Sequence, residues 1–399
     1  MKNSIIKKKN KKKLISHISE IIINGIKKNY KESKIYLHEP LLDNQDSKQL
    51  SEVIKTGYVS TIGKNVIKFQ KKLKKFTKSK YVLAVNSGTS ALHLSLLAID
   101  VKKNHEVLLS SLSFIASSNA VSYCGASCIF ADIMDEGYGI DYFKLENYLK
   151  KNCSIKNNHC INNKTGKIIK CLIVVHIFGS CNDLSKLSKI CKKYKLKIIE
   201  DAAEAMGSYY KRRHLGTFGD IGIVSFNGNK IITTGSGGCV LTNNKSYYYR
   251  IKSLATSCKI SHPWSFFYSG LGYNYMMNNM QASLGISQLN KISKLLSLKK
   301  KIHNRYRIEF KNNDYFKLFI PPKYCRSNNW LNSLILNKKY LTFRNDILKY
   351  LNKKNVFCRA MWPLMIESPH LKKSLKMNLI NSKKLSKSVI CLPSSPKIN

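Results

Sequence analysis

The sequence predicts an α/β protein with a mostly parallel central sheet and a smaller C-terminal α+β domain. From residue 81 onward, short apolar runs of strand length alternate with segments of helix length, as happens when crossover helices join parallel strands. After about residue 285 this alternation gives way to a long amphipathic segment. The 399 residues are 43% hydrophobic, which is enough for a large core and excludes a disordered chain.

Apolar runs of strand length are predicted to form the sheet. In chain order they are residues 81–85, 107–109, 127–132, 171–178, 197–201, 221–226 and 239–242. Residues 89–99 and 183–194 are predicted to be helices, because their apolar side chains recur at helical spacing. The long segment after residue 285 is predicted to be a helix whose buried stripe consists of Leu289, Ile292, Leu296, Ile302 and Tyr306.

We expect three parts along the chain, since a domain takes roughly 100–200 residues. Residues 1–35 are lysine-rich and are predicted to be a basic N-terminal extension, with a short amphipathic stretch at residues 18–26. Residues 36–285 are predicted to form the large α/β domain. Residues 286–399 are predicted to form the small C-terminal domain.

The chain carries a formal charge of +47, from 69 Lys plus Arg against 22 Asp plus Glu. Such a charge could indicate a nucleic-acid-binding protein. Only eight of the basic residues are arginine, however, and specific readers of nucleic acids rely on the bidentate arginine fork. The lysines are also spread along the whole chain. We therefore favour a compositional bias and expect no specific nucleic-acid partner.

The cysteines and the apolar runs bear on metal binding and location. None of the 12 cysteines forms a C-x-x-C pair or a cluster with histidine at zinc-ligand spacing, so we expect reduced thiols and no metal. The longest apolar run, residues 171–178, is well short of the roughly 20 residues of a membrane helix. The N-terminus lacks the apolar core of a signal peptide. We expect a cytoplasmic protein without a membrane partner.

Residues 86–92, Asn-Ser-Gly-Thr-Ser-Ala-Leu, form a small-residue turn between a predicted strand and a predicted helix. The free backbone N–H groups of such a turn, with the hydroxyls of Ser87, Thr89 and Ser90, would suit an anion such as phosphate. The same residues are also preferred at an ordinary helix N-cap. The turn alone leaves both interpretations open.

Two further strand ends carry reactive side chains. The strand at residues 197–201 runs directly into Asp201, and a buried acid there needs a partner, although Asp201 could simply cap the next helix. Lys230 is the one lysine between residues 215 and 244, and it lies between an apolar strand and a glycine-rich turn. A single lysine is usually a surface side chain, but this one is the best nucleophile candidate. A lysine amine, a strand-end aspartate and a phosphate cradle are together what pyridoxal phosphate requires.

The motifs at residues 86–93, 200–204, 216–220, 225–230 and 272–275, in this order, resemble those of the DegT/DnrJ/EryC1/StrS family of nucleotide-sugar aminotransferases. The resemblance extends from about residue 36 to residue 395. It implies the type I fold of pyridoxal-phosphate-dependent transferases, with residues 36–285 as the cofactor-binding domain. A finer resemblance, to the LegC-type branch, which aminates UDP-linked 4-keto-6-deoxy-N-acetylhexosamines, comes from residues 37–40, 58–64, 226–230 and 392–395.

The resemblance implies a role for each matching residue. Lys230 would hold the cofactor as a Schiff base and then act as the general base, Asp201 would pair with the pyridine nitrogen, and Glu204 would lie near the phenolic oxygen. The remaining cofactor-binding residues would be Gly88, Thr89 and Ser225 at the phosphate, Phe114 on the ring, and Asn274 at the phosphate of the neighbouring subunit. The implied protein is a homodimer with shared active sites. Phe114 could alternatively be a plain core aromatic.

A lysine at position 230 favours transamination, because the related dehydratases carry histidine there. The implied amino donor is L-glutamate. The implied acceptor is a nucleotide-linked 4-keto-6-deoxy sugar, above all UDP-4-keto-6-deoxy-N-acetylhexosamine, on a route to surface polysaccharides or nonulosonic acids. GDP-4-keto-6-deoxymannose as substrate, or a non-catalytic regulator, remain alternatives. Two positions depart from the family pattern: Met276 replaces a usual arginine, and Asn278 replaces a common proline.

Overall fold

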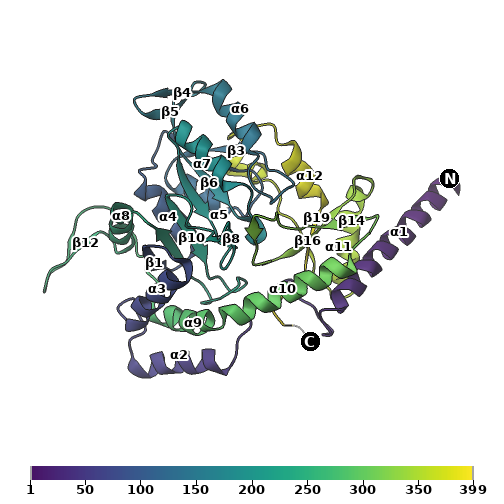
Figure 1. Cartoon of the computed structure of the whole chain (residues 1–399), viewed down its shortest axis with the longest axis horizontal. Coiled ribbons are helices and arrows are strands. Elements are labelled where there is room, and N and C mark those ends of the chain that lie inside the picture. Colours follow the sequence, from purple (N-terminus) through teal and green to yellow (C-terminus); the bar gives the residue numbers. More distant parts are fainter. Residues whose placement is uncertain (1, 398–399) are drawn as a thin grey trace.

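The computed structural model describes residues 2–397, and side chains from residue 10 onward (Figure 1). Within these residues, ten strands form a central sheet in the order β1-β11-β10-β7-β6-β2-β3-β18, with the β4–β5 hairpin attached to β6. The strands are β1 (Tyr81–Val85), β2 (His105–Ser110), β3 (Ser127–Ala131), β4 (Cys153–Lys156), β5 (His159–Asn162), β6 (Ile168–Val175), β7 (Lys197–Asp201), β10 (Ile221–Ser225), β11 (Gly238–Thr242) and β18 (Leu375–Lys376). All the predicted strands are present, and the predicted fold class is confirmed.

The centre of the sheet is parallel. β3, β2, β6, β7 and β10 pair in parallel, and β11 runs antiparallel between β10 and β1. β6 ends earlier than predicted, at Val175, and is followed by the 3-10 turn η1 (Ile177–Gly179), in which Phe178 has φ 54°. The carboxyl ends of β1, β6, β7 and β10 thus lie at one edge of the sheet, together with the first residue of β11.

Helices connect the strands of the sheet. They are α4 (Gly88–Ala98), α5 (Ala116–Tyr123), α6 (Tyr142–Asn152), α7 (Leu184–Lys193) and α8 (Lys245–Ala255), and two earlier helices, α2 (Asn44–Thr56) and α3 (Lys64–Thr77), pack against α9. The two helices predicted in this region are confirmed as α4 and α7. Their starts are set by side-chain caps, because Ser87 accepts the N–H of Ser90 and Asp183 accepts those of Ser185 and Lys186.

The long helix predicted after residue 285 is two successive helices, α9 (Asn279–Asn290) and α10 (Ile292–Glu309), with Lys291 between them. Figure 1 shows α10 running from α9 toward the small sheet. The predicted stripe is buried at four positions and partly buried at Leu296. Lys299 lies on the same face and is fully buried, which the apolar pattern did not predict.

The C-terminal region contains a small antiparallel sheet in the order β14-β16-β19-β17. Its elements are β14 (Phe316–Leu318), β16 (Asn332–Leu336), β17 (Arg359–Ala360), β19 (Val389–Leu392), α11 (Arg344–Lys353), α12 (Ile380–Ser388) and the 3-10 turns η2 (Lys338–Phe343), η3 (Met365–Glu367) and η4 (Pro369–Leu371). This α+β content agrees with the prediction, although β18 from this region joins the central sheet beside β3. The domain boundary at residue 285 stays a prediction.

Short strands form two further pairings outside these sheets. β15 (Cys325–Arg326), β8 (Tyr209–Tyr210) and β9 (Arg213–His214) pair with one another. β12 (Lys259–Ile260) and β13 (Phe267–Tyr268) form a hairpin, and Figure 1 shows the segment around β12 projecting away from the body of the protein. In the described part of the chain, no helix is long and apolar enough to cross a bilayer.

The N-terminal segment differs from the extension that the sequence predicts. Helix α1 (Lys2–Lys27) contains the expected amphipathic stretch, and Ile18, Ile22 and Ile26 are fully buried. These side chains belong to a hydrophobic cluster with residues of α10, α11 and the small sheet. Ile35 also forms a backbone bridge with Val356. The second half of the segment is therefore an integral part of the smaller core.

Candidate active site

A pocket of about 450 Å³ lies where the strand ends of the central sheet meet. Seven of the eight residues predicted to form the site line it: Gly88, Thr89, Phe114, Asp201, Glu204, Ser225 and Lys230. A larger hollow of about 600 Å³ lies at the opposite edge of the sheet, where β7 and β10 begin, and it contains none of them. We therefore take the smaller pocket as the candidate site.

Strand register creates a close backbone approach on one side of the pocket. Gly238 of β11 pairs with both Val85 at the end of β1 and Ser225 at the end of β10. A Cβ atom on Gly238 would lie 2.8 Å from the backbone nitrogen of Gly88, and one on Gly88 would lie 3.0 Å from the Cβ atom of Ser225. Only glycine fits at Gly238, and the first turn of α4 can approach a ligand closely.

The hydroxyls of this turn do not all face a ligand. Ser87 Oγ accepts the N–H of Ser90 at 3.0 Å, and the hydroxyl of Ser90 donates to Asn86 Oδ1 at 2.7 Å. The hydroxyl of Ser90 is thus directed at Asn86, whereas Ser87 caps α4 through its oxygen and also lines the pocket, so a role of these hydroxyls toward an anion stays a prediction. Thr89 and Ser225 line the pocket, next to the N-terminal backbone N–H groups of α4, so an anion can still be bound here.

Asp201, the last residue of β7, is held in place by its neighbours. Its Oδ2 atom accepts the hydroxyl of Ser117 at 2.6 Å, and its Oδ1 atom accepts the N–H of Ala203 at 3.2 Å. The carboxylate is 6% exposed and lines the pocket. Ser117 was missed in the sequence, although it lies only three residues after Phe114, in the first turn of α5.

Glu204 forms an ion pair with Lys230, with 3.3 Å between Oε1 and Nζ. Its Oε2 atom accepts the backbone N–H of Phe178 at 2.9 Å. Burial raises the pKa of the Glu204 carboxyl, and the nearby Lys230 only partly opposes this effect. Phe178 makes its contact from φ 54°, a region that aromatic residues rarely adopt, so the turn after β6 stores strain at the site.

Trp330 covers the amine of Lys230. The Nζ atom of Lys230 lies 4.0 Å from the centroid of the Trp330 ring. The indole N–H donates to the carbonyl of Asn229 at 2.6 Å. Sequence reasoning missed this residue, because it lies 100 positions from the lysine and no local motif links the two.

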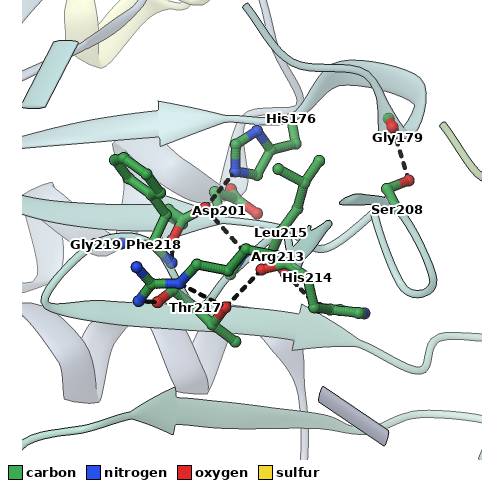
Figure 2. A network of polar contacts seen from close by, with 12 residues as sticks. His176, Gly179, Asp201, Ser208, Arg213, His214, Leu215, Thr217, Phe218 and Gly219 are labelled. Atoms are coloured by element: carbon green, nitrogen blue, oxygen red, sulfur yellow. Dashed lines mark hydrogen bonds and ion pairs between the residues drawn. The ribbon is translucent and has the colours of Figure 1, made fainter. Parts of the chain in front are cut away.

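Glu200 points away from the pocket, although it precedes Asp201 in the motif. It is fully buried, and it contacts His176 Nε2 at 2.8 Å and accepts the N–H of Gly216 at 2.9 Å and that of Gly219 at 2.6 Å. Burial would raise the pKa of Glu200, but these hydrogen bonds hold it below its ordinary value. Figure 2 shows His176 together with labelled residues of the 213–219 loop, and the bonds to Glu200 tie this loop to β7.

The residues around 274–278 lie outside the pocket. Asn274 is exposed, and its carbonyl accepts the side chain of Asn86 at 3.4 Å, so its role toward a second subunit stays a prediction. Asn278 caps α9 in a reciprocal box with Gln281, which explains how a residue other than proline starts this helix. Met276 forms a backbone bridge with Val85 and packs against the main core.

The pocket fits pyridoxal phosphate. Close backbone packing at Gly88 and Gly238 forms a cradle of N–H groups for the phosphate. The buried carboxylate of Asp201 suits a protonated pyridine nitrogen, and the amine of Lys230 suits the aldehyde. Phe114 lines the pocket with a ring that is 56% exposed and free to stack on a ligand.

The α/β sheet and this combination of lysine, aspartate and phosphate cradle define an enzyme of the type I pyridoxal-phosphate-dependent class. The model of the DegT/DnrJ/EryC1/StrS aminotransferase family matches residues 40–399, and the chain belongs to this family. The prediction from the motifs is confirmed, and the chain is a pyridoxal-phosphate-dependent aminotransferase. Membership of the LegC-type branch stays a prediction.

Similar proteins extend over most of the chain. A GDP-perosamine synthase of Vibrio cholerae is 31% identical over 82% of this chain and 84% of its own. A UDP-4-amino-4,6-dideoxy-N-acetyl-beta-L-altrosamine transaminase of Campylobacter jejuni is 31% identical over 91% of this chain and 93% of its own. Among solved structures, Helicobacter pylori PseC, an aminotransferase involved in the biosynthesis of pseudoaminic acid, matches with a TM-score of 0.83 and 26% identity, covering 92% of this chain and 95% of PseC.

Proposed function

We propose that this enzyme transfers the amino group of L-glutamate to the 4-keto group of a nucleotide-linked 4-keto-6-deoxy sugar. The observation that carries the proposal is the amine of Lys230, held 3.3 Å from Glu204 in a pocket that also contains Asp201 and the cradle at Gly88. A lysine in this place can move protons at a substrate carbon, as transamination requires.

Bound pyridoxal phosphate supplies an electron-withdrawing ring that stabilises negative charge on the substrate carbon. Asp201, whose Oδ2 atom accepts the hydroxyl of Ser117, would accept a hydrogen bond from the protonated ring nitrogen. Thr89 and Ser225, which line the pocket, would donate their hydroxyls to the phosphate, and Phe114 would pack on the ring. The amine of Lys230 would take the proton from the donor carbon and deliver it to the cofactor carbon, and Glu204 would orient this amine.

Arg359 is the proposed contact for the carboxylate of the amino donor. It lies on β17 with an exposed side chain, and it lines the pocket. Among the described residues that line this pocket, Arg359 and Lys230 are the cationic ones. A guanidinium binds a carboxylate through two parallel hydrogen bonds, which suits the carboxylates of L-glutamate.

The preferred acceptor is UDP-4-keto-6-deoxy-N-acetylhexosamine, as the LegC-type resemblance implies. The Campylobacter jejuni transaminase named for a UDP-linked amino sugar supports this choice at 31% identity. The GDP-perosamine synthases, also up to 35% identical, support GDP-4-keto-6-deoxymannose as the second candidate. The product would enter the biosynthesis of surface polysaccharides or nonulosonic acids.

The proposed enzyme is a cytoplasmic homodimer with shared active sites. Large apolar side chains are exposed on two segments, one around residue 62 and one at residues 264–271. The exposed fractions are 85% for Ile62, 83% for Trp264 and 81% for Leu271, and such a surface suits burial against a second copy. Asn274 follows the second segment closely and would reach the partner's cofactor phosphate. The cysteines are free thiols, which suits the reducing cytoplasm.

A panel of two keto sugars tests the proposal. Purified enzyme with pyridoxal phosphate and L-glutamate is offered the UDP-linked and the GDP-linked 4-keto-6-deoxy sugar, and 2-oxoglutarate and the amino sugar are measured by mass spectrometry. We expect stoichiometric formation of both products from the UDP-linked sugar and none with Lys230→Ala. Turnover of the GDP-linked sugar alone would establish the second candidate, and no turnover of either would favour the regulator.

A further inference from the structure

Trp330 connects the region of the small sheet to the central sheet at Lys230. It lies just before β16 of the small sheet, whereas Lys230 follows β10 of the central sheet. Its ring lies 4.0 Å from the amine of Lys230, and its indole N–H bonds the carbonyl of Asn229 at 2.6 Å. One side chain therefore contacts both the reactive amine and the backbone that carries it.

The backbone of Trp330 is fixed from the same side as Glu204. Its N–H donates to Asn328 Oδ1 at 2.9 Å. The side-chain amide of Asn328 in turn donates to the carbonyls of Glu204 and Met206, both at 2.9 Å. The position of the Trp330 ring is thus tied to the segment that supplies the carboxylate partner of Lys230.

A buried lysine fixes Trp330 from the other side. Lys299 of α10 is fully buried in the otherwise apolar stripe, and its Nζ atom donates to the carbonyl of Trp330 at 2.6 Å and to that of Ser394. Within the described residues, Lys299 bonds backbone carbonyls and forms no ion pair with a carboxylate, and burial lowers its pKa well below the ordinary value. Burying a lysine amine costs free energy unless hydrogen bonds compensate for the lost water, and here the compensating bonds are those to the two carbonyls.

We propose that Trp330 is a positioning residue for Lys230, and that Lys299 anchors it. This inference rests on the proposed function. A lysine side chain has several rotatable bonds, so a free amine would sample many positions. The aromatic face and the bond to Asn229 restrict the amine to the side of Glu204. Such restriction raises the rate of proton transfer without changing the affinity for the amino donor.

The test measures the donor half-reaction, which needs no sugar. Cofactor-free protein is mixed with pyridoxal phosphate, and the rate at which the visible absorption band forms is recorded, followed by the single-turnover rate of its loss with L-glutamate. We expect Trp330→Leu to slow both rates about 10- to 100-fold, while the half-saturating concentration of L-glutamate changes less than about 3-fold. Trp330→Phe, which keeps a ring, should recover both rates to within about 5-fold of the unmodified enzyme.

Two further variants complete the set. Lys299→Met should slow both rates by a smaller factor than Trp330→Leu. It retains the Trp330 ring and removes only the hydrogen bond that holds the Trp330 backbone. Tyr350→Phe is the matched control. It removes a hydroxyl that bonds Glu20 at 2.7 Å in the smaller core, away from the pocket, and we expect unchanged rates.

Each outcome decides the matter. Wild-type rates in Trp330→Leu would overturn the inference and leave the proposed function intact. Wild-type rates of the donor half-reaction together with slowed turnover of Trp330→Leu in the keto-sugar assay would assign Trp330 to sugar binding and would also overturn the inference. If Trp330→Leu does not fold, Lys299→Met decides, because wild-type rates there contradict the anchor. Failure of the unmodified enzyme to form a band that depends on Lys230 would overturn the proposed function itself.

Discussion

The amine of Lys230 lies 3.3 Å from a carboxylate oxygen of Glu204, although the two residues follow different strands of the central sheet. The other oxygen of Glu204 is occupied by the N–H of Phe178. The carboxylate therefore connects the reactive lysine to the strained turn after β6. This contact gives Glu204 a role in orienting the amine, in addition to any contact with the cofactor.

Replacing Glu204 tests that role. Glu204→Gln keeps the shape of the side chain but has a single acceptor oxygen, so we expect the rate of the donor half-reaction to fall about 10-fold or less. Glu204→Ala leaves the N–H of Phe178 without its partner, and we expect a larger loss of rate and about 1–3 kcal/mol lower stability. Single-turnover kinetics and urea unfolding check both. Equal rates in the Gln and Ala variants would contradict the orienting role.

The close packing at Gly238 predicts a strong effect of one methyl group. A Cβ atom there would lie 2.8 Å from the backbone nitrogen of Gly88, so Gly238→Ala must displace the phosphate cradle. A loss of about 1.4 kcal/mol of binding free energy raises a dissociation constant tenfold. We expect the displaced cradle to cost at least this much, so the dissociation constant of the variant for pyridoxal phosphate should rise about 10-fold or more. Titration of the visible absorption measures it.

The carboxylate of Glu200 predicts acid sensitivity. Its hydrogen bonds hold its folded-state pKa below the ordinary value of 4.5, so the unfolded chain binds a proton more readily than the folded one. The stability that Glu200 contributes is complete above pH 4.5 and is lost as the pH falls through the folded-state pKa. Urea unfolding across this range should show a shallower pH dependence in Glu200→Gln than in the unmodified enzyme. An identical slope would contradict the prediction.

The departure at Met276 is predicted to be tolerated. Met276 is partly buried against the main core, and an arginine stem can follow the same surface with its head in solvent. We expect Met276→Arg to retain the activity of the unmodified enzyme in the keto-sugar assay. A clear loss of activity would indicate that this position has adapted to a different ligand.

The strand ends of the site were predictable because each apolar run ends at or near a polar residue or a glycine that can be recognised in the sequence. Asp201 and Ser225 end buried strands, Gly88 begins the helix shortly after a third, and parallel strands bring such ends to one edge of a sheet. The packing of α1 was less visible, because its lysines obscure the isoleucines that recur at helical spacing. In the structure, Ile18 and Ile22 complete the smaller core.

Contacts between distant segments could not be predicted. The amine of Lys299 bonds the backbone carbonyl of Trp330, and no sequence pattern marks a backbone group as a hydrogen-bond partner. Lys299 occupies a position of the apolar stripe where only a hydrophobic residue is expected. The different roles of Glu200 and Asp201 could not be predicted either. Neighbouring strand residues face opposite sides of the sheet, and the partner of Glu200, His176, follows another strand.

Catalysis through Lys230 can be tested by the visible absorption of the enzyme with pyridoxal phosphate, before and after L-glutamate, beside a Lys230→Ala control. We expect a visible band that forms only with Lys230 present and that is lost when L-glutamate is added, because the donor half-reaction converts the cofactor. A folded protein that shows no such band, or a Lys230→Ala variant that shows the same band and the same loss, would contradict catalysis through Lys230.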